Sequence, residues 1–382
     1  MIERMDALML PLNWQRVRLG DIAEIIGGGT PSTQVASFWN GSINWFTPTE
    51  IGITKYVHKS QRTITLLGLK KSSAKLLPIG TILLTSRASI GDCTILKVVA
   101  TTNQGFQSLI PLEKINNEFL YYLILTLKNK LLKLASGSTF LEVSPNKIKN
   151  LLIPLPPLNE QIAIANILSD VDNYLHALRA LILKKESVKK ALSFELLSQR
   201  KRLKDFNQNW QRVRLGDICN YLTSNLSAEQ ITQQGKIKVY DVNNFIGYTD
   251  TTFISDKPYI SIVKDGSVGR VRILPPKTNI LSTMGALIAN HKTTTEFLFY
   301  LLSNFDFKNF TSGSIIPHIY FKDYKEKTIF LPPLNEQSAI ADILSALDHE
   351  IISLKNKKRQ FENIKKALNH DLMSAKIRVL NK

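Results

Sequence analysis

The sequence has little cysteine and no long apolar run, and each shortage excludes a class of protein. The two cysteines, Cys93 and Cys219, have no ligand-like neighbours, so we expect neither a disulfide framework nor a zinc site. A chain without disulfides fits a reducing compartment. No apolar stretch approaches the roughly 18 residues of a membrane span, and the first residues do not resemble a signal peptide. We therefore expect a cytoplasmic protein with no membrane partner.

The patterns of common nucleic-acid enzymes are also missing. There is no G-x-x-x-x-G-K-[ST] phosphate loop and no H-E-x-x-H zinc motif. No Glu is followed two residues later by Lys, which removes half of a common nuclease metal site. Both Pro-Pro pairs stand between leucines, which cannot hold a flipped base as a base N-methyltransferase loop does. The Gly-rich stretch Gly27–Pro31 lacks the phosphate-loop lysine, and we interpret it as a turn that lets backbone approach a phosphate. These absences predict a chain with no metal, no cofactor and no catalysis of its own.

Positive charge is abundant. The 382 residues include 49 Lys and Arg against 31 Asp and Glu, a net charge of +18 that is spread over the whole length. Such an excess favours a polyanionic partner, with nucleic acid first and an anionic membrane second. A basic protein that binds no polyanion is the alternative. A chain of this length can hold two or three domains with sizeable cores.

Two motifs occur twice. Asn13–Ile22 returns unchanged as Asn209–Ile218, and Leu155–Gln161 returns as Leu331–Gln337. The copies lie 196 residues apart at the first motif, 178 apart at Gly91 and Gly269, and 176 apart at the second motif, so the first copy holds about 18 extra residues before Gly91. The repeat predicts a pseudo-symmetric protein whose halves differ most in one stretch.

Each copy begins with mixed α/β sequence and continues into one long helix. Runs such as Thr81–Thr85 and Tyr259–Val263 are typical of strands, and Glu118–Ala135 and Glu296–Asn304 of helices. Neither Gly nor Pro interrupts the chain between Asn159 and Asp205 or after Asn335, and both asparagines are good N-cap residues. We therefore divide the chain into residues 1–157, 158–204, 205–333 and 334–382, two globular domains that each precede a spacer helix.

Apolar residues follow both long helices in steps of three and four, as in a coiled coil. The predicted seams are Leu168, Val171, Leu175, Leu178, Ile182, Val188, Leu192 and Leu196 in the first helix, and Leu344, Leu347, Ile351, Leu354, Phe361, Ile364, Leu368 and Leu372 in the second. We expect the helices to pair with each other in antiparallel orientation, although each could instead pack on its own domain. Lysines beside the seams, such as Lys184-Lys185 and Lys365-Lys366, fit a solvated face or contacts to phosphate.

The chain resembles the specificity subunit of a type I restriction-modification system. The resemblance spans essentially the whole sequence and rests on the doubled order of Trp motif, Leu-Pro-Pro-Leu-x-Glu-Gln motif and long helix. Further matching segments are Gly28–Ser32, Phe38–Trp45, Leu77–Thr81, Pro154–Leu168 and Asp265–Gly269. The second copy lacks the Gly-Gly-Thr-Pro-Ser stretch, so its half belongs to a different subtype.

The resemblance implies an α+β fold with two globular α/β target-recognition domains, separated by a pair of long antiparallel coiled-coil helices with pseudo-two-fold symmetry. Each domain would read one half of a split asymmetric site in double-stranded DNA. Two modification subunits would supply S-adenosylmethionine and adenine methylation, and up to two restriction subunits would supply ATP- and Mg-dependent cleavage. The alternatives are a stand-alone DNA-binding or scaffold protein, and an enzyme with an unrecognised active site.

Candidate contact residues follow from side-chain chemistry. Forked or long polar donors next to turns suit base reading, and small hydroxyl residues suit phosphate or groove contacts. The DNA-binding candidates are Thr30, Arg87, Gln104, Ser138, Lys264, Arg270, Asn290 and Ser314. Each could equally serve its own turn. Glu160, Gln161, Glu336 and Gln337 either cap the long helices or bind the modification subunits. Trp14 and Trp210 fit core anchors better than base-stacking platforms.

Overall fold

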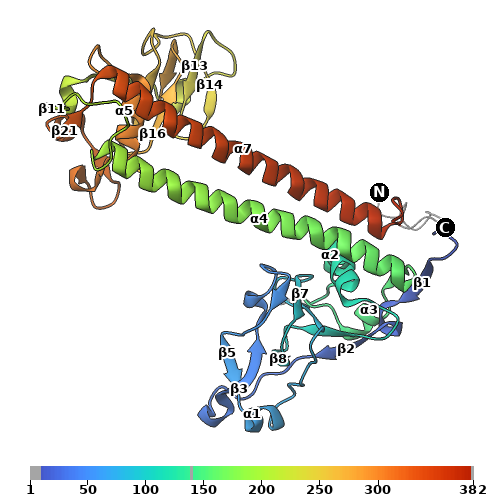
Figure 1. The fold of residues 1–382 in the computed structure, drawn as a ribbon. Coiled ribbons are helices and arrows are strands. Elements are labelled where there is room, and N and C mark those ends of the chain that lie inside the picture. Colours follow the sequence, from blue (N-terminus) through green and yellow to red (C-terminus); the bar gives the residue numbers. More distant parts are fainter. Residues whose placement is uncertain (1–9, 138–140, 380–382) are drawn as a thin grey trace. The chain divides into compact units, whose positions relative to one another are not determined.

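The computed structural model describes residues 10–137 and 141–379, which form two compact units. The first unit runs to Ala177 and resumes at Lys358, and the second comprises Leu178–Lys357. Each unit therefore holds one globular domain and part of both long helices, α4 and α7 (Figure 1). We call the globular part before α4 domain 1 and the one between α4 and α7 domain 2.

Domain 1 is built on one five-stranded sheet in the order β2-β9-β6-β7-β4, with a three-stranded sheet in the order β5-β3-β8. Strand β1 pairs with β10 in antiparallel orientation and closes the domain at the start of α4. The strands are β1 (Gln15–Arg18), β2 (Ala23–Gly27), β3 (Trp39–Phe46), β4 (Tyr56–Val57), β5 (Arg62–Ile64), β6 (Ile82–Leu84), β7 (Cys93–Leu96), β8 (Ala100–Thr102), β9 (Gln107–Pro111) and β10 (Leu152–Leu155). The helices are α1 (Leu66–Lys70), α2 (Asn117–Leu134), α3 (Pro145–Lys149) and α4 (Leu158–Leu197).

Domain 2 repeats the order of the strands that the two domains share. Its sheets run β12-β18-β15-β16 and β14-β13-β17, and β11 pairs with β21 as β1 pairs with β10. The strands are β11 (Gln211–Arg214), β12 (Cys219–Thr223), β13 (Ile237–Tyr240), β14 (Phe245–Thr249), β15 (Tyr259–Val263), β16 (Val271–Leu274), β17 (Thr278–Ile280), β18 (Met284–Ala289), β19 (Thr311–Ser312), β20 (His318–Ile319) and β21 (Thr328–Leu331). The helices are α5 (Thr295–Ser303), α6 (Phe321–Tyr324) and α7 (Leu334–Met373).

The insertion in domain 1 adds structure without changing the shared sheets. Strand β4 and helix α1 have no counterpart in domain 2, and both lie in the stretch where the copies differ. The parallel pair β3·β8 corresponds to β13·β17, and the antiparallel pair β3·β5 to β13·β14. The α+β architecture predicted for both globular domains is thus confirmed, and the domains also share the order of their common strands, which the sequence had not predicted.

Each unit has its own hydrophobic core at the junction of domain and long helices. In the first unit, buried α2 residues such as Phe119 and Tyr122 pack with Leu168 of α4 and Leu372 of α7. In the second, Phe297 of α5 packs with Leu344 of α7 and Leu196 of α4. Trp14 and Trp210 are buried in these cores, which confirms their prediction as core anchors. Burial is the dominant driving force here, because each helix leaves an apolar stripe that only a neighbour can cover.

The long helices pair in antiparallel orientation within each unit. In the first unit Tyr174 of α4 stacks on Phe361 of α7, with ring centroids 4.6 Å apart. In the second unit three ion pairs join the helices, Lys185–Glu350, Lys189–Asp348 and Glu186–Lys355. Of the lysines beside the seams, Lys185 and Lys365 form ion pairs between the helices, whereas Lys184 and Lys366 are exposed, as either a solvated face or a phosphate contact requires.

Two details of the helix prediction are wrong. Val188 and Ile364 are not seam residues but surface residues, 46% and 51% exposed. They are equivalent positions, 176 residues apart. Next to each of them the two helices are joined by an ion pair, Lys189–Asp348 beside Val188 and Lys365–Asp172 beside Ile364. The helices also begin one residue before Asn159 and Asn335, which lie inside the first turn and are not N-caps.

Candidate nucleic-acid interface

The loop between β6 and β7 carries the forked donor predicted for domain 1. Ala88 adopts a left-handed conformation (φ 55°) at its tip, and Ser86 is held by backbone hydrogen bonds to Gly105 and Val143. Arg87 projects from this loop and forms an ion pair with Glu142, with Nη2 and Oε2 2.8 Å apart. Both side chains are partly exposed, 42% for Arg87 and 32% for Glu142. An exposed pair of this kind is weak, so a stronger acceptor can displace the carboxylate.

Thr30 and Gln104 are brought together at the surface of domain 1. The Thr30 hydroxyl donates a hydrogen bond to Gln104 Oε1, and both residues are exposed. The Trp45 indole positions the segment before Thr30 by donating to the Gly29 carbonyl at 2.9 Å. A Cβ at Gly28 would lie 1.9 Å from the Asn103 carbonyl oxygen. The glycine thus allows close approach to the chain's own backbone, whereas the sequence had suggested an approach to phosphate.

The loop between β15 and β16 occupies the equivalent place in domain 2. Gly266 has a positive φ of 84°, as Ala88 does in domain 1, and Lys264 is held by backbone hydrogen bonds to Thr283 and Ile319. These partners match Gly105 and Val143 of domain 1. Asp265 pairs with His318 of β20, with Oδ1 and Nδ1 2.6 Å apart. The two loops are therefore the same structural feature with different side chains.

The order of the acidic and the basic residue is reversed between the loops. In domain 1 the loop carries the cation, Arg87, and the facing segment carries the anion, Glu142. In domain 2 the loop carries the anion, Asp265, and β20 carries the basic residue, His318. Both pairs also form backbone β-bridges, so the reversal involves positions whose backbones coincide. Equivalent scaffolds thus present opposite charge at the same point.

The remaining candidates are dispersed. Arg270 is exposed, and its guanidinium donates to Asn243 Oδ1 at 2.8 Å. Asn290 serves its own turn, because its amide donates to the Asp217 carbonyl and its oxygen accepts from the Lys292 amide. Ser314 is exposed next to Gly313, which has a positive φ. Ser138 lies outside the described residues.

The four residues predicted to cap the helices or bind partners are buried inside the chain. Glu160 accepts a hydrogen bond from the Trp14 indole and pairs with Arg378, and Glu336 does the same with Trp210 and Arg202. The Gln161 side chain accepts a hydrogen bond from the Asn116 backbone amide and donates to the carbonyls of Lys114 and Pro156. The Gln337 side chain forms the equivalent hydrogen bonds with the loop before α5 and with the Pro332 carbonyl. Their exposed fractions are 1% or less. These side chains join each domain to its long helix, so they offer no surface to a modification subunit.

No metal or membrane chemistry is evident in the part of the chain that the structure describes. It contains no group of three or more His, Cys, Asp and Glu residues that could hold a metal ion. None of its helices is both long and apolar enough to cross a bilayer. Both cysteines are free and buried, and burial raises the pKa of the Cys219 thiol to about 12.

Comparison with known proteins agrees with this doubled geometry. Residues 11–186 and 207–363 each match the type I restriction modification DNA specificity domain. The chain belongs to this family. The two matched ranges are the two copies of the repeat, so one specificity domain comprises a globular domain together with most of the long helix that follows it.

Two specificity subunits match over nearly their full length. The MjaIX specificity subunit of Methanocaldococcus jannaschii is 29% identical, over 98% of this chain and 96% of its own. The EcoprrI specificity subunit of Escherichia coli is 25% identical, over 90% of each chain. Among solved structures, the S subunit of a type I system from M. genitalium superposes with a TM-score of 0.61 at 20% identity, covering 96% of this chain and 98% of its own. That likeness supports the specificity-subunit fold.

Each specificity domain also has a polar anchor that sequence reasoning missed. The Tyr122 hydroxyl of α2 donates to Asp172 of α4, which pairs with Lys365 of α7. Tyr300 of α5, Asp348 of α7 and Lys189 of α4 repeat the arrangement. Burial, and next the hydrogen bond to the aspartate, raise the pKa of both tyrosines, so both hydroxyls stay protonated donors. The signal was present, because all three residue types recur at the offsets of the repeat.

Proposed function

We propose that this chain is the DNA sequence-recognition subunit of a type I restriction-modification complex, in which each domain reads one half of a split asymmetric site. The observation that carries the proposal is the reversed pair of an acidic and a basic residue at equivalent loops of a shared scaffold. A symmetric scaffold with identical tips would suit a palindrome. Equivalent tips of opposite polarity suit two different half-sites.

The proposed reading of double-stranded DNA rests on charge and side-chain chemistry. A net charge of +18 supports long-range attraction to the phosphate backbone, which is independent of sequence. Arg87 supports base reading in domain 1, because a guanidinium can donate two hydrogen bonds to guanine O6 and N7 in the major groove. Thr30 with Gln104, and Arg270 in domain 2, are further contact candidates.

We also propose residues 1–157 and 205–333 as the recognition domains, and residues 158–204 and 334–382 as spacers that set the length of the unread gap. Two modification subunits would bind equivalent surfaces and contribute S-adenosylmethionine, and two restriction subunits would contribute ATP and Mg chemistry. Since the Glu-Gln motifs are buried, we propose that exposed apolar residues of the helices form the contact surface for the modification subunits. Val188 and Ile364 are suitable because they are equivalent, exposed and apolar.

Single-molecule sequencing of methylated bases in host DNA tests this function. We expect a split asymmetric motif with methyladenine on opposite strands, one in each half. A contiguous palindrome would contradict the proposal. Purification under gentle conditions separates the alternative of a stand-alone DNA-binding or scaffold protein, because a specificity subunit should retain its methyltransferase.

The partner surface has its own test. Val188→Asp and Ile364→Asp, singly and together, should reduce the methyltransferase retained per chain, by one equivalent for each single variant. Leu152→Asp, at another exposed apolar position, is the matched control and should retain both equivalents. Full retention by the double variant would place the contact elsewhere.

A further inference from the structure

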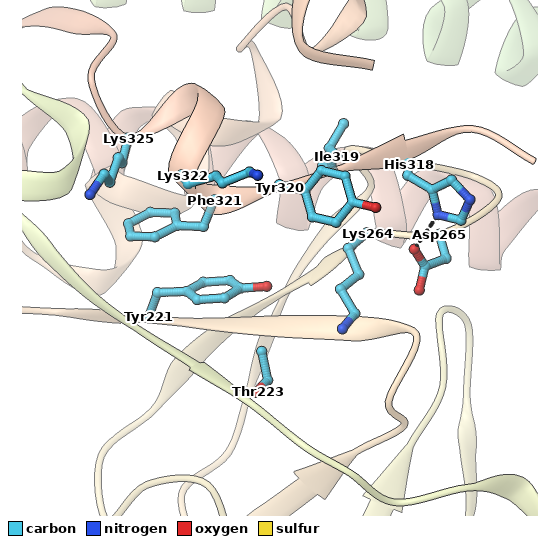
Figure 2. Close-up of a pocket in the computed structure, with 10 residues that line it drawn as sticks. All are labelled: Tyr221, Thr223, Lys264, Asp265, His318, Ile319, Tyr320, Phe321, Lys322 and Lys325. Carbon is cyan, nitrogen blue, oxygen red and sulfur yellow. Dashed lines mark hydrogen bonds and ion pairs between the residues drawn. The ribbon is translucent and has the colours of Figure 1, made fainter. Parts of the chain in front are cut away.

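Domain 2 contains an open pocket of about 610 Å³ beside the reversed pair (Figure 2). Its walls come from β12, from the loop after β15, from β20 and from α6. All of these elements belong to the second unit, and they bring together residues as distant in sequence as Tyr221 and Lys325. Nothing in the function proposed above assigns a ligand to this pocket.

The pocket offers an ammonium and hydroxyl groups, all of which can donate hydrogen bonds. Across residues 10–137 and 141–379, the Lys264 ammonium has no hydrogen bond or ion pair with another side chain. Tyr221 and Tyr320, each with a hydroxyl, line the same pocket as Lys264 (Figure 2). The one carboxylate in the lining, Asp265, is already engaged by His318 at 2.6 Å. An ammonium with two hydroxyls suits an anion, whereas the edge of a base presents both donors and acceptors.

The aromatic walls favour a phosphate over a stacked base. Phe321 covers Tyr221 with a centroid distance of 4.6 Å and an interplanar angle of 9°. Gly285 holds the same tyrosine from the sheet, since a Cβ there would lie 2.4 Å from its hydroxyl oxygen. The Lys322 ammonium lies 5.4 Å from the centre of the Tyr320 ring. With these neighbours in place, the rings serve to position their hydroxyls.

We propose that this pocket binds a phosphate of the DNA backbone at the second half-site, with Lys264 as the charged donor and Tyr221 and Tyr320 as neutral donors. The inference rests on the proposed DNA-recognition function. Burial, and next the Asp265 charge, raise the pKa of Tyr221, so its hydroxyl keeps the proton that it would donate. Lys264 thereby contributes to the register of domain 2 on DNA and not to base identity.

Domain 1 cannot make the same contact. The residue equivalent to Lys264 is Ser86, which is 1% exposed and donates its hydroxyl hydrogen to the Gly105 carbonyl at 3.2 Å. A small neutral side chain turned into the domain offers nothing to a phosphate. The phosphate site is therefore a property of domain 2 alone, and Ser86 provides a matched control.

The test uses the complete complex with its modification subunits and DNA that contains the methylated motif. Binding of wild type and Lys264→Met is measured by fluorescence anisotropy over a range of salt concentrations. We expect Lys264→Met to weaken binding roughly tenfold on cognate and non-cognate DNA alike. The slope of log affinity against log salt should become shallower by about 0.9, the value for one phosphate contact. Ser86→Ala should change neither quantity.

Neutral methylphosphonate linkages, placed one at a time through the second half-site, locate the contact. One linkage should weaken wild-type binding roughly tenfold and should have no further effect on Lys264→Met. Tyr320→Phe should reduce sensitivity to the same linkage while leaving the unfolding midpoint of the chain unchanged.

Three outcomes would overturn the inference: an unchanged salt slope, no linkage coupled to Lys264, or an altered base preference, which would make Lys264 a base reader. If the wild-type complex binds its split motif and these effects are absent, only the phosphate site fails. If the wild-type complex recognises no split motif, the proposed function itself fails.

Discussion

Domain 1 and domain 2 differ where DNA would be read and agree where the chain must hold itself together. The Trp–Glu–Arg junctions, the Tyr–Asp–Lys anchors and the strand order are common to both. The loops after β6 and β15 share a backbone but carry Arg87 against Asp265 and Ser86 against Lys264. The difference teaches that specificity can change at a few side chains while the frame stays constant, because the frame is fixed by buried contacts elsewhere.

Loss of the buried junction carboxylate should destabilise both halves of the chain equally. Glu160→Ala and Glu336→Ala each remove a buried carboxylate that pairs with an arginine and accepts from an indole, so each should lower the free energy of unfolding by about 3–5 kcal/mol. Denaturant titration followed by circular dichroism measures the loss. Because buried thiols react only when exposed, alkylation should reach Cys93 faster in the first variant and Cys219 faster in the second. Unequal losses would argue against an equivalent frame.

The loop of domain 1 should separate stability from recognition. Arg87→Glu alone places two acids together, and adding Glu142→Arg restores a pair of reversed polarity. We expect the double variant to regain the stability lost by the single one, at most about 1 kcal/mol for an exposed pair. It should still lose about 1–3 kcal/mol in discrimination of the first half-site, as Arg87→Ala does. Competition binding on DNA with either half-site altered measures this, and recovery of recognition would make the pair purely structural.

The polar anchors should contribute less than the junctions. Tyr122→Phe and Tyr300→Phe each delete the hydrogen bond to a charged aspartate that keeps its lysine, and Tyr122→Phe also removes the acceptor of a hydrogen bond from Lys55. Each variant should lower the free energy of unfolding by about 1–2 kcal/mol. Denaturant titration of the two variants side by side checks the equality. Tyr56→Phe, which removes a bond made only in domain 1, is the unsymmetric control.

The surface positions should contribute least to folding. Val188→Ser and Ile364→Ser leave the seam intact because both residues point away from it, so each should change the free energy of unfolding by no more than about 0.5 kcal/mol. Leu178→Ser, at a buried seam position, should destabilise the chain by several times that amount. A large loss in the free energy of unfolding for Val188→Ser would show that Val188 belongs to the seam, as the sequence predicted.

The sequence predicted the elements that depend on local pattern and repetition. The long helices, the strand Tyr259–Val263 and the helices α2 and α5 follow from periodicity and composition. The burial of Glu160 could not be predicted in this way, because its partners Trp14 and Arg378 are 146 and 218 residues away in the sequence. A charged residue in a motif is predicted to be exposed unless the partners that neutralise it in the fold are known.

The predicted seam failed at Val188 for a related reason. An apolar residue was assigned to the interface, while the ion pairs of Lys185 and Lys189 occupy that level in the structure. The reversed pair was not predicted either, because the contacts of Glu142 and His318 with the facing loops depend on the fold. The Lys189–Asp348 pair recurs as Lys365–Asp172, and the reversed pair occupies equivalent positions of the two copies. A residue-by-residue alignment of the copies would therefore have revealed both.

The central claim is that each domain reads one half of the site. Its most direct test exchanges the segment from Ala23 to Pro111, β2 to β9 of domain 1, for that of another specificity subunit of the same subtype. The methylated motif is then determined by single-molecule sequencing. The account predicts a new first half with the gap and the second half unchanged. A change in both halves, or in neither, would contradict it.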